Sequence, residues 1–182
     1  MTPVAITAAQ PFASLLAHGI AEWHTSRTRP RLEPGQEVWV HAGKEVDWPA
    51  TYRPEIERAL HDAGTCVVDI TQRGCPWLGA VLSRHRLAEV VPIVDSDSRN
   101  DDGSGYDYGS DGPCIASGAT NGFGDLTRWS SIEDDDWLDI PNQLPYADWS
   151  PGRWAWRLEL IERLETPVRG YLDCCDGTMY HG

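Results

Sequence analysis

Two histidines and one lysine near the N-terminus are of the residue types that a phosphodiester-cleaving site uses. His24 and His41 each lie where a strand is expected to end, so one imidazole could act as a base and the other as an acid. Lys44 is the only lysine in the chain and could stabilise the negative charge that develops during cleavage. The alternative is that each histidine is a hydrogen-bonded structural residue. His24, His41 and Lys44 are therefore the candidate catalytic residues of a ribonuclease-like hydrolase.

The same region holds side chains suited to binding a base. Gln10 carries an amide oxygen and an amide NH₂, as recognition of a base edge requires, or it could cap the helix that follows. Phe12 lies on the apolar stripe of that helix, which favours the core over a ligand platform. Trp23 and Trp39 could each stack on a base or a ribose. Trp39 is the better candidate because it lies opposite the apolar face of its strand.

Three arginines lie in one short loop that contains a proline. Each of Arg27, Arg29 and Arg31 offers a forked pair of donors that could contact a phosphate. The alternative is a solvated loop whose arginines pair with Glu33 or with acidic residues further along the chain. Arg27 and Arg29 are retained as candidate ligand-binding residues.

Hydrophobic patterns predict the elements that position these residues. Alternation over residues 37–42 predicts a strand with Val38 and Val40 on one face and Trp39 and His41 on the other. Residues 4–8, 20–25 and 153–162 are also expected to be strands, residues 66–70 a strand or the approach to one, and residues 77–94 two strands or one long bent strand. Helices are expected at 11–18 and 53–63, each followed by a glycine. These elements predict an α+β, mainly β fold: a small β-barrel with peripheral helices.

Acidic residues are concentrated in one segment of the chain. Residues 95–139 hold twelve of the 28 Asp and Glu but only two of the 15 Lys and Arg, while residues 1–94 hold ten acids and nine bases. The net charge of −13 therefore leaves residues 1–94 nearly neutral, and a nucleic-acid surface there is permitted. Residues 95–140 are rich in Gly, Ser and Asp, which predicts a long acidic loop inserted into a single domain of residues 1–182. Residues 95–139 could also bind a basic protein partner.

The composition indicates where the protein works. No run approaches the roughly 20 apolar residues of a membrane span, and the N-terminus lacks a basic region followed by an apolar one, so we expect a cytoplasmic protein with no membrane contact. Five cysteines without a C-x-x-C pair are typical of reduced thiols. We therefore expect no metal and no other cofactor.

The order of several short motifs resembles the ASCH (activating-signal-cointegrator homology) family of PUA-like domains. Members typically begin with a strand, followed by Gln-Pro-Trp or Gln-Pro-Phe and a helix that ends in Gly. A turn that contains Gly then leads to a strand ending in His-Ala. The last strand has the motif Ser-Pro-Gly-Arg-Tyr/Trp-Ala-Trp. The matching residues here are Gln10-Pro11-Phe12, Gly19, Gly35, His41-Ala42 and residues 150–156, with a Pro-x-x-Gly tail at 167–170. The resemblance covers roughly residues 5–94 and 146–172, on either side of the acidic segment.

The resemblance implies a PUA-like barrel that binds RNA, single-stranded nucleic acid or a (modified) nucleotide in a cleft beside its N-terminal helix. It adds Arg153, within the closing motif, to the candidate ligand-binding residues. In ASCH amidohydrolases that act on acetylated cytidine, a Lys shortly after the helix-ending Gly, a Thr and a Glu are thought to do the chemistry. This chain has Ala21 in place of the Lys, and His24 occupies the expected Thr position. Binding without chemistry, a nucleoside amidohydrolase with rearranged residues, and a ribonuclease all stay open.

Overall fold

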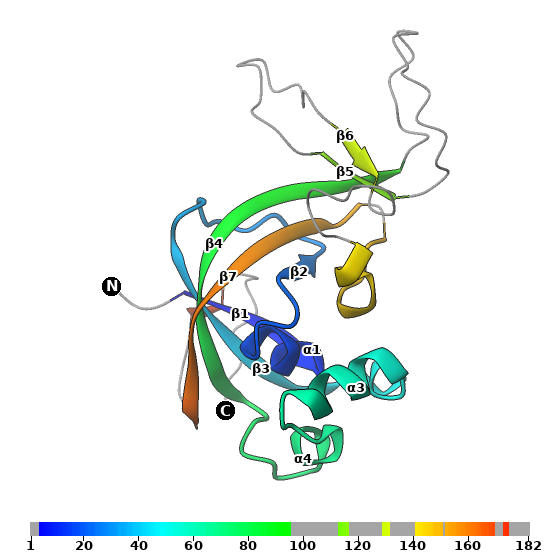
Figure 1. Ribbon diagram of the computed structural model, residues 1–182. Coiled ribbons are helices and arrows are strands. Elements are labelled where there is room, and N and C mark those ends of the chain that lie inside the picture. Colours follow the sequence, from blue (N-terminus) through cyan, green and yellow to red (C-terminus); the bar gives the residue numbers. More distant parts are fainter. Residues whose placement is uncertain are drawn as a thin grey trace, which may run out of the picture.

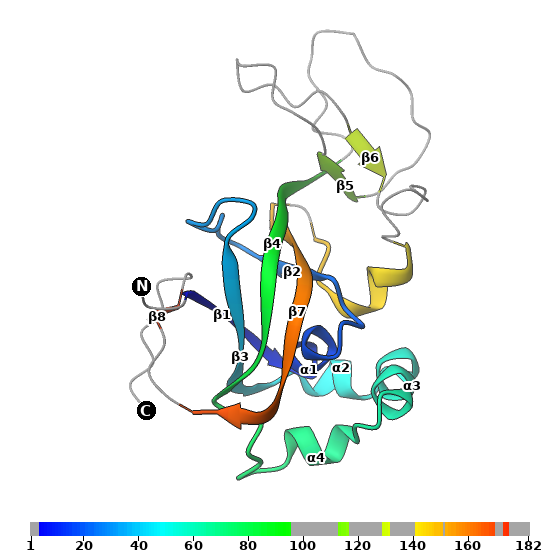
Figure 2. The same ribbon diagram turned by 60° about the vertical axis from the view of Figure 1, so that its left-hand side comes forward.

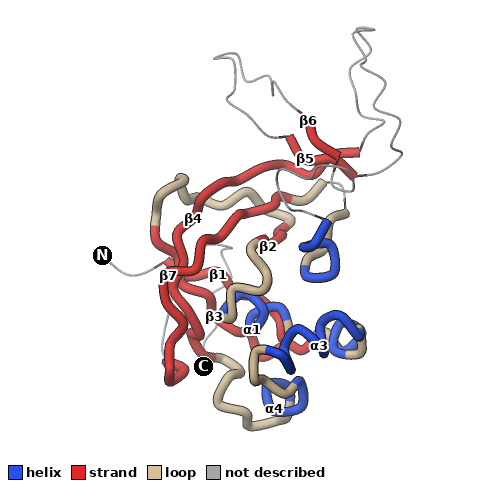
Figure 3. Tube along the Cα trace, in the orientation of Figure 1, coloured by secondary structure: helices blue, strands red, loops and turns tan. Residues whose placement is uncertain are grey.

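The protein has a mixed α/β fold made mainly of strands, with a few short helices (Figures 1 and 3). The computed structural model describes residues 4–95, 113–116, 129–131, 141–150, 152–169 and 173–174. The main strands are β1 (Val4–Gln10), β2 (Trp23–Ser26), β3 (Glu37–Val46), β4 (Ala80–Asp95) and β7 (Trp154–Val168). The helices are α1 (Phe12–Ala17), α2 (Trp48–Thr51), α3 (Pro54–Asp62), α4 (Val67–Thr71) and the 3-10 helix η2 (Pro141–Tyr146). The predicted mainly β class is confirmed.

The sheet is open, so the predicted closed β-barrel is wrong. The five main strands follow the order β2-β7-β4-β3-β1, and the short strand β8 (Asp173–Cys174) pairs with the start of β1. β1 runs parallel to β3, and the other neighbours among these five strands are antiparallel. In the described part of the chain, β1 and β2 lie at opposite ends of this order and do not pair.

Side chains occupy the edge at which a barrel would have to close. Gln143 of η2 accepts a hydrogen bond from the Glu22 backbone N–H at 2.7 Å and donates to the Ile20 carbonyl at 3.1 Å. Arg153 donates to the Thr25 carbonyl at 3.2 Å. Backbone groups in and next to β2 are therefore satisfied by side chains rather than by a further strand, which is the physical reason that the sheet stays open.

Helix α1 lies against the concave face of the curved sheet (Figures 1 and 2). Residues 13–17 of this helix are all buried. On β3, Val38 and Val40 are fully buried in the same core while Trp39 and His41 are half-buried, which confirms the predicted alternation. Burying each large aliphatic side chain contributes about 1.5–3 kcal/mol, so this core fixes β1, β3 and α1 relative to one another.

Local sequence preference was overridden in one segment. Residues 66–70 were expected to be a strand or its approach, but Val67–Thr71 forms helix α4. The Thr71 hydroxyl donates to the Val67 carbonyl at 2.8 Å, and Ile70 is buried in the main core. Packing of Ile70 therefore outweighs the strand preference of this β-branched run.

The other predicted elements are found with shifted ends. Most of residues 77–94 lies in the single long strand β4, which begins at Ala80, and the pairing of β4 with β7 changes register at three places. β2 begins at Trp23 rather than at residue 20, because the backbone N–H groups of Ile20 and Ala21 bond back to the Leu15 carbonyl at the end of α1. The predicted helix of residues 53–63 is α3, and it is followed by Gly64 at φ +75°.

Little of the acidic segment lies in the described part of the chain. Strand β5 (Pro113–Ala116) pairs with the end of β4 and with β6 (Trp129–Ser131). The rest of residues 95–140 lies outside the described residues, and a basic partner for residues 95–139 stays a prediction. No helix within the described ranges is long and apolar enough to cross a membrane.

The fold holds two histidines in surroundings that disfavour their protonation. His85 on β4 is fully buried with Nε2 2.9 Å from the Ser83 hydroxyl, and burial lowers its pKa to about 4. His18, which follows α1, lies 2.8 Å through Nε2 from the Thr65 hydroxyl and accepts a bond from Arg163 at Nδ1, 3.1 Å away. Burial first, and then the charge of Arg163, lower the pKa of His18. Both imidazoles are therefore neutral structural groups at neutral pH.

Candidate functional site

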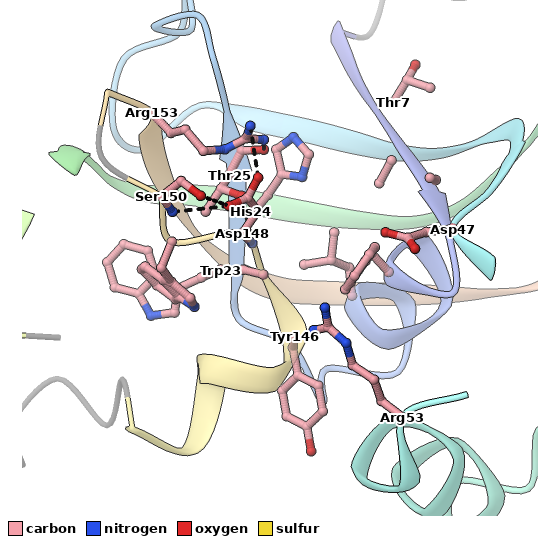
Figure 4. Close-up of a pocket in the computed structure, with 16 residues that line it drawn as sticks. Thr7, Trp23, His24, Thr25, Asp47, Arg53, Tyr146, Asp148, Ser150 and Arg153 are labelled. Carbon is pink, nitrogen blue, oxygen red and sulfur yellow. Dashed lines mark hydrogen bonds and ion pairs between the residues drawn. The ribbon is translucent and has the colours of Figure 1, made fainter. Parts of the chain in front are cut away.

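Two adjoining cavities lie between β1 and β2, on the side where the sheet does not close. The larger has a volume of about 710 Å³ and the smaller about 280 Å³. They share four lining residues, Thr7, His24, Thr25 and Arg153, so one ligand could occupy both. Figure 4 shows His24, Thr25 and Arg153 gathered at one end of the larger cavity, away from Asp47.

The wall of the larger cavity opposite the sheet is built by short segments rather than by the sheet itself. Asp47 precedes α2 and accepts a bond from the Ala50 N–H at 3.0 Å, which caps this helix. Arg53 precedes α3 and donates to the Pro145 carbonyl at 3.2 Å, which ties α3 to the segment of residues 141–150. Gln143 fastens the same segment to the chain before β2 through its two hydrogen bonds. These contacts hold Asp47 and Arg53 at the cavity (Figure 4).

Aromatic side chains form much of the apolar surface of the larger cavity. Trp23 and Trp149 are buried and meet edge to face, with ring centroids 5.8 Å apart. Phe12 and Tyr146 are half-buried and pack against the main core while they also line the cavity. A flat ligand between these walls would contact apolar surface and still reach Asp47, as small-molecule sites usually require.

Asp148 carries the negative charge nearest to the junction of the cavities. Its Oδ2 lies 3.1 Å from Nη1 of Arg153, and its Oδ1 accepts bonds from the backbone N–H and the hydroxyl of Ser150. The hydroxyl bond from Ser150 first, and then the bond from its backbone N–H and the charges of Arg153 and Arg27, outweigh burial and hold the pKa of Asp148 below its usual range. Asp148 is therefore ionised at neutral pH and balances the charge of Arg153.

Of the three candidate catalytic residues, only His24 lines the two cavities. His24 lines both of them and packs edge to face against Trp156, with ring centroids 5.3 Å apart. His41 lines neither, but its Nδ1 is 3.2 Å from the hydroxyl of Thr7, which lines both. The exposed side chain of Lys44 lies beside Gly79 and also lines neither cavity.

Four of the candidate ligand-binding residues reach the cavities. Phe12 and Trp23 line the larger cavity, Arg27 lines the smaller one, and Arg153 lines both. Arg29 instead stacks its guanidinium over the ring of Trp154 at 5.4 Å and lines neither cavity. Arg27 and Arg29 of the basic loop therefore lie in different surroundings, and of these two only Arg27 lines a cavity.

Two further candidates lie elsewhere in the fold. Gln10 is fully buried and accepts a bond from the Ser14 N–H at 3.2 Å, so it has the helix-supporting role that the sequence left open. Trp39 lies on the other face of β3, where its indole N–H donates to Glu37 at 3.1 Å. Arg84 covers the Trp39 ring at 5.9 Å. Neither Gln10 nor Trp39 lines either cavity.

Sequence reasoning missed several residues of the larger cavity. Asp47 and Arg53 had a local signal, because each precedes a helix with proline at one of its first two positions. Tyr146 and Asp148 had none, since only the tertiary fold brings residues 141–150 against β2.

No group of three or more His, Cys, Asp or Glu within the described ranges is placed to hold a metal ion.

Comparison of the chain with protein-family models gives no match. Comparison with curated proteins also gives no match. The geometry of the two cavities is therefore the observation on which a function can be argued.

Proposed function

We propose that the protein is an ASCH-like, PUA-related domain that binds nucleic acid, RNA or a single (modified) nucleotide in the larger cavity. The observation that carries this proposal is an aromatic-walled cavity of about 710 Å³ that also contains Asp47, Arg53 and His24. Its volume is in the range of about 300–1,000 Å³ that is usual for small-molecule sites. The motif order that resembles the ASCH family supports the same class of ligand.

A base fits the chemistry of this cavity. Aromatic faces stack on any base, while a carboxylate accepts from exocyclic amino groups and a guanidinium donates to ring nitrogens and carbonyls. Tyr146 offers a ring at the cavity wall, and Asp47 and Arg53 offer the two kinds of polar group. An unpaired base, as in single-stranded RNA or a free nucleotide, presents both its faces and its edge.

Binding to single-stranded RNA, tRNA, single-stranded DNA and nucleosides tests the proposal. Retention of labelled RNA is expected at low salt and should weaken as salt rises. Tyr146→Leu keeps apolar bulk but removes the phenol ring, and it should weaken binding by about 5- to 150-fold, the loss of one stacked base. Tyr52→Leu is the matched control, because Tyr52 is 78 % exposed and lines neither cavity. Absence of binding to all four ligands at low salt would refute the proposal.

A hydrolase is the second candidate, and the position of His24 is the observation that favours it. His24 lines both cavities, so its imidazole lies at the junction where a base in one cavity would be joined to the group in the other. His41 has a link to the same junction through Thr7. Incubation with RNA and with acylated nucleosides tests this candidate. Products that disappear with His24→Gln are expected, and unchanged substrates would remove it.

A further inference from the structure

The smaller cavity has the composition of an anion site. Its lining includes the guanidinium groups of Arg27 and Arg153 and the hydroxyl residues Thr7, Thr25 and Ser26. No carboxylate side chain belongs to its lining in the part of the chain that the structure describes. The larger cavity differs, because Asp47 and Asp148 line it beside Arg53 and Arg153. Negative charge on a ligand is therefore favoured in the smaller cavity.

Arg27 supplies the cation that is available to a ligand there. Arg153 already bonds to Asp148 at 3.1 Å and to the Thr25 carbonyl at 3.2 Å. The Arg27 side chain is exposed, and its charge contributes to the lowered pKa of Asp148, but no hydrogen bond or ion pair joins it to another described residue. Its forked donors match two oxygens of a phosphate group and are not engaged in a hydrogen bond within the described fold.

We propose that the two cavities form one composite site for a phosphorylated nucleoside, with the base in the larger cavity and its phosphate in the smaller one against Arg27. This inference rests on the proposed function and specifies the ligand further. The smaller cavity, at about 280 Å³, lies below the usual size of a complete ligand site but accommodates a substituent of a larger molecule. The four shared residues place the two parts of such a ligand side by side.

Titrations with matched ligands test the composite site. A nucleoside, its 5′-monophosphate, its 3′-monophosphate and a dinucleotide are compared with the wild-type protein at low and high salt. At least one phosphorylated ligand binds about 10- to 100-fold more tightly than the nucleoside, as charge-assisted hydrogen bonds provide. The preference decreases as salt rises, because Arg27 is exposed. The position of the preferred phosphate distinguishes a free mononucleotide from an internal linkage of RNA.

Two arginine variants separate this inference from general electrostatic attraction. Arg27→Ala should reduce the ratio of nucleotide to nucleoside affinity to near one. Arg31→Ala is the matched control from the same loop, since Arg31 is exposed and lines neither cavity. Nucleoside binding without any preference for phosphate, or a preference that survives Arg27→Ala, overturns the composite site but leaves the proposed function standing. Failure of every nucleoside, nucleotide and RNA ligand to bind overturns both.

Discussion

Replacing His85 by Gln should make the stability of the protein less sensitive to acid. His85 is fully buried on β4, and its pKa is about 4 in the folded protein against an ordinary value of 6.5. Above pH 6.5 the imidazole is neutral in both states and contributes no pH dependence. As the pH falls below 6.5, the unfolded chain binds a proton that the folded protein does not bind until the pH nears 4. The folded state is therefore progressively destabilised over this window.

The size of the effect follows from the interval between the two pKa values. At about 1.4 kcal/mol per pH unit, the interval corresponds to a loss of about 3 kcal/mol, of which about 2 kcal/mol falls between pH 7.5 and pH 5. Urea unfolding at both pH values measures the free energy of unfolding of the wild type and of His85→Gln. The variant retains a hydrogen-bonding side chain near Ser83 but has no imidazole to protonate.

The measured quantity is the change in the free energy of unfolding between pH 7.5 and pH 5. This change is informative even where the variant is less stable than the wild type at both pH values. His61→Gln is the matched control, because the His61 side chain is 86 % exposed on α3. Its free energy of unfolding should change between the two pH values by as much as that of the wild type. The free energy of unfolding of His85→Gln should fall by about 2 kcal/mol less than that of the wild type between pH 7.5 and pH 5. An identical loss in His85→Gln and in the wild type would refute the argument that burial suppresses protonation of His85.

Two further substitutions test the support of the site and of α1. Gln143→Ala removes the side-chain partner of two backbone groups beside β2 and should lower the free energy of unfolding by about 2–4 kcal/mol. The control is Gln36→Ala, because Gln36 is exposed, and it should lower the free energy of unfolding by less than about 1 kcal/mol. Equal losses for the two variants in urea unfolding would contradict the anchoring role of Gln143. Gly19→Ala places a Cβ at φ +67° and 3.2 Å from a Leu160 side-chain carbon, so urea unfolding should show a loss of about 1–2 kcal/mol, and an unchanged midpoint would contradict the strain.

The sequence predicted best where one local pattern determined one element. Alternation over residues 37–42 identified β3 and the face that Val38 and Val40 bury. Pro11 before the apolar stripe and Gly19 after it bracketed α1. Patterns of this kind depend on side-chain periodicity, which a single sequence contains in full.

The candidate site was predicted only in part because it depends on long-range contacts. Of the candidate residues, His24, Arg27 and Arg153 line one or both cavities. His41 and Lys44 lie on β3 together with Trp39, and none of the three lines either cavity. The strand residues of the larger cavity come from residues 7–9 of β1 and residues 23–25 of β2, whereas β3 contributes no residue to either lining. Adjacency in sequence therefore overstated how closely these side chains gather.

Closure of the sheet could not be read from strand content. A run of strands is compatible with a closed barrel or an open sheet, and the choice depends on what meets the two end strands. Here Gln143 and Arg153 meet β2, and they come from more than 100 residues further along the chain.

The side chains along β2 also have a consequence for how the protein behaves at high concentration. An end strand with free backbone groups is a template on which another chain can add a strand, and this is a common route to aggregation. Gln143 and Arg153 already bond to the backbone in and beside β2, and the Thr25 hydroxyl accepts from the Asp148 N–H at 3.2 Å. The contacts that keep the sheet open thus also occupy part of its edge, which leaves fewer backbone groups on which another chain could add a strand.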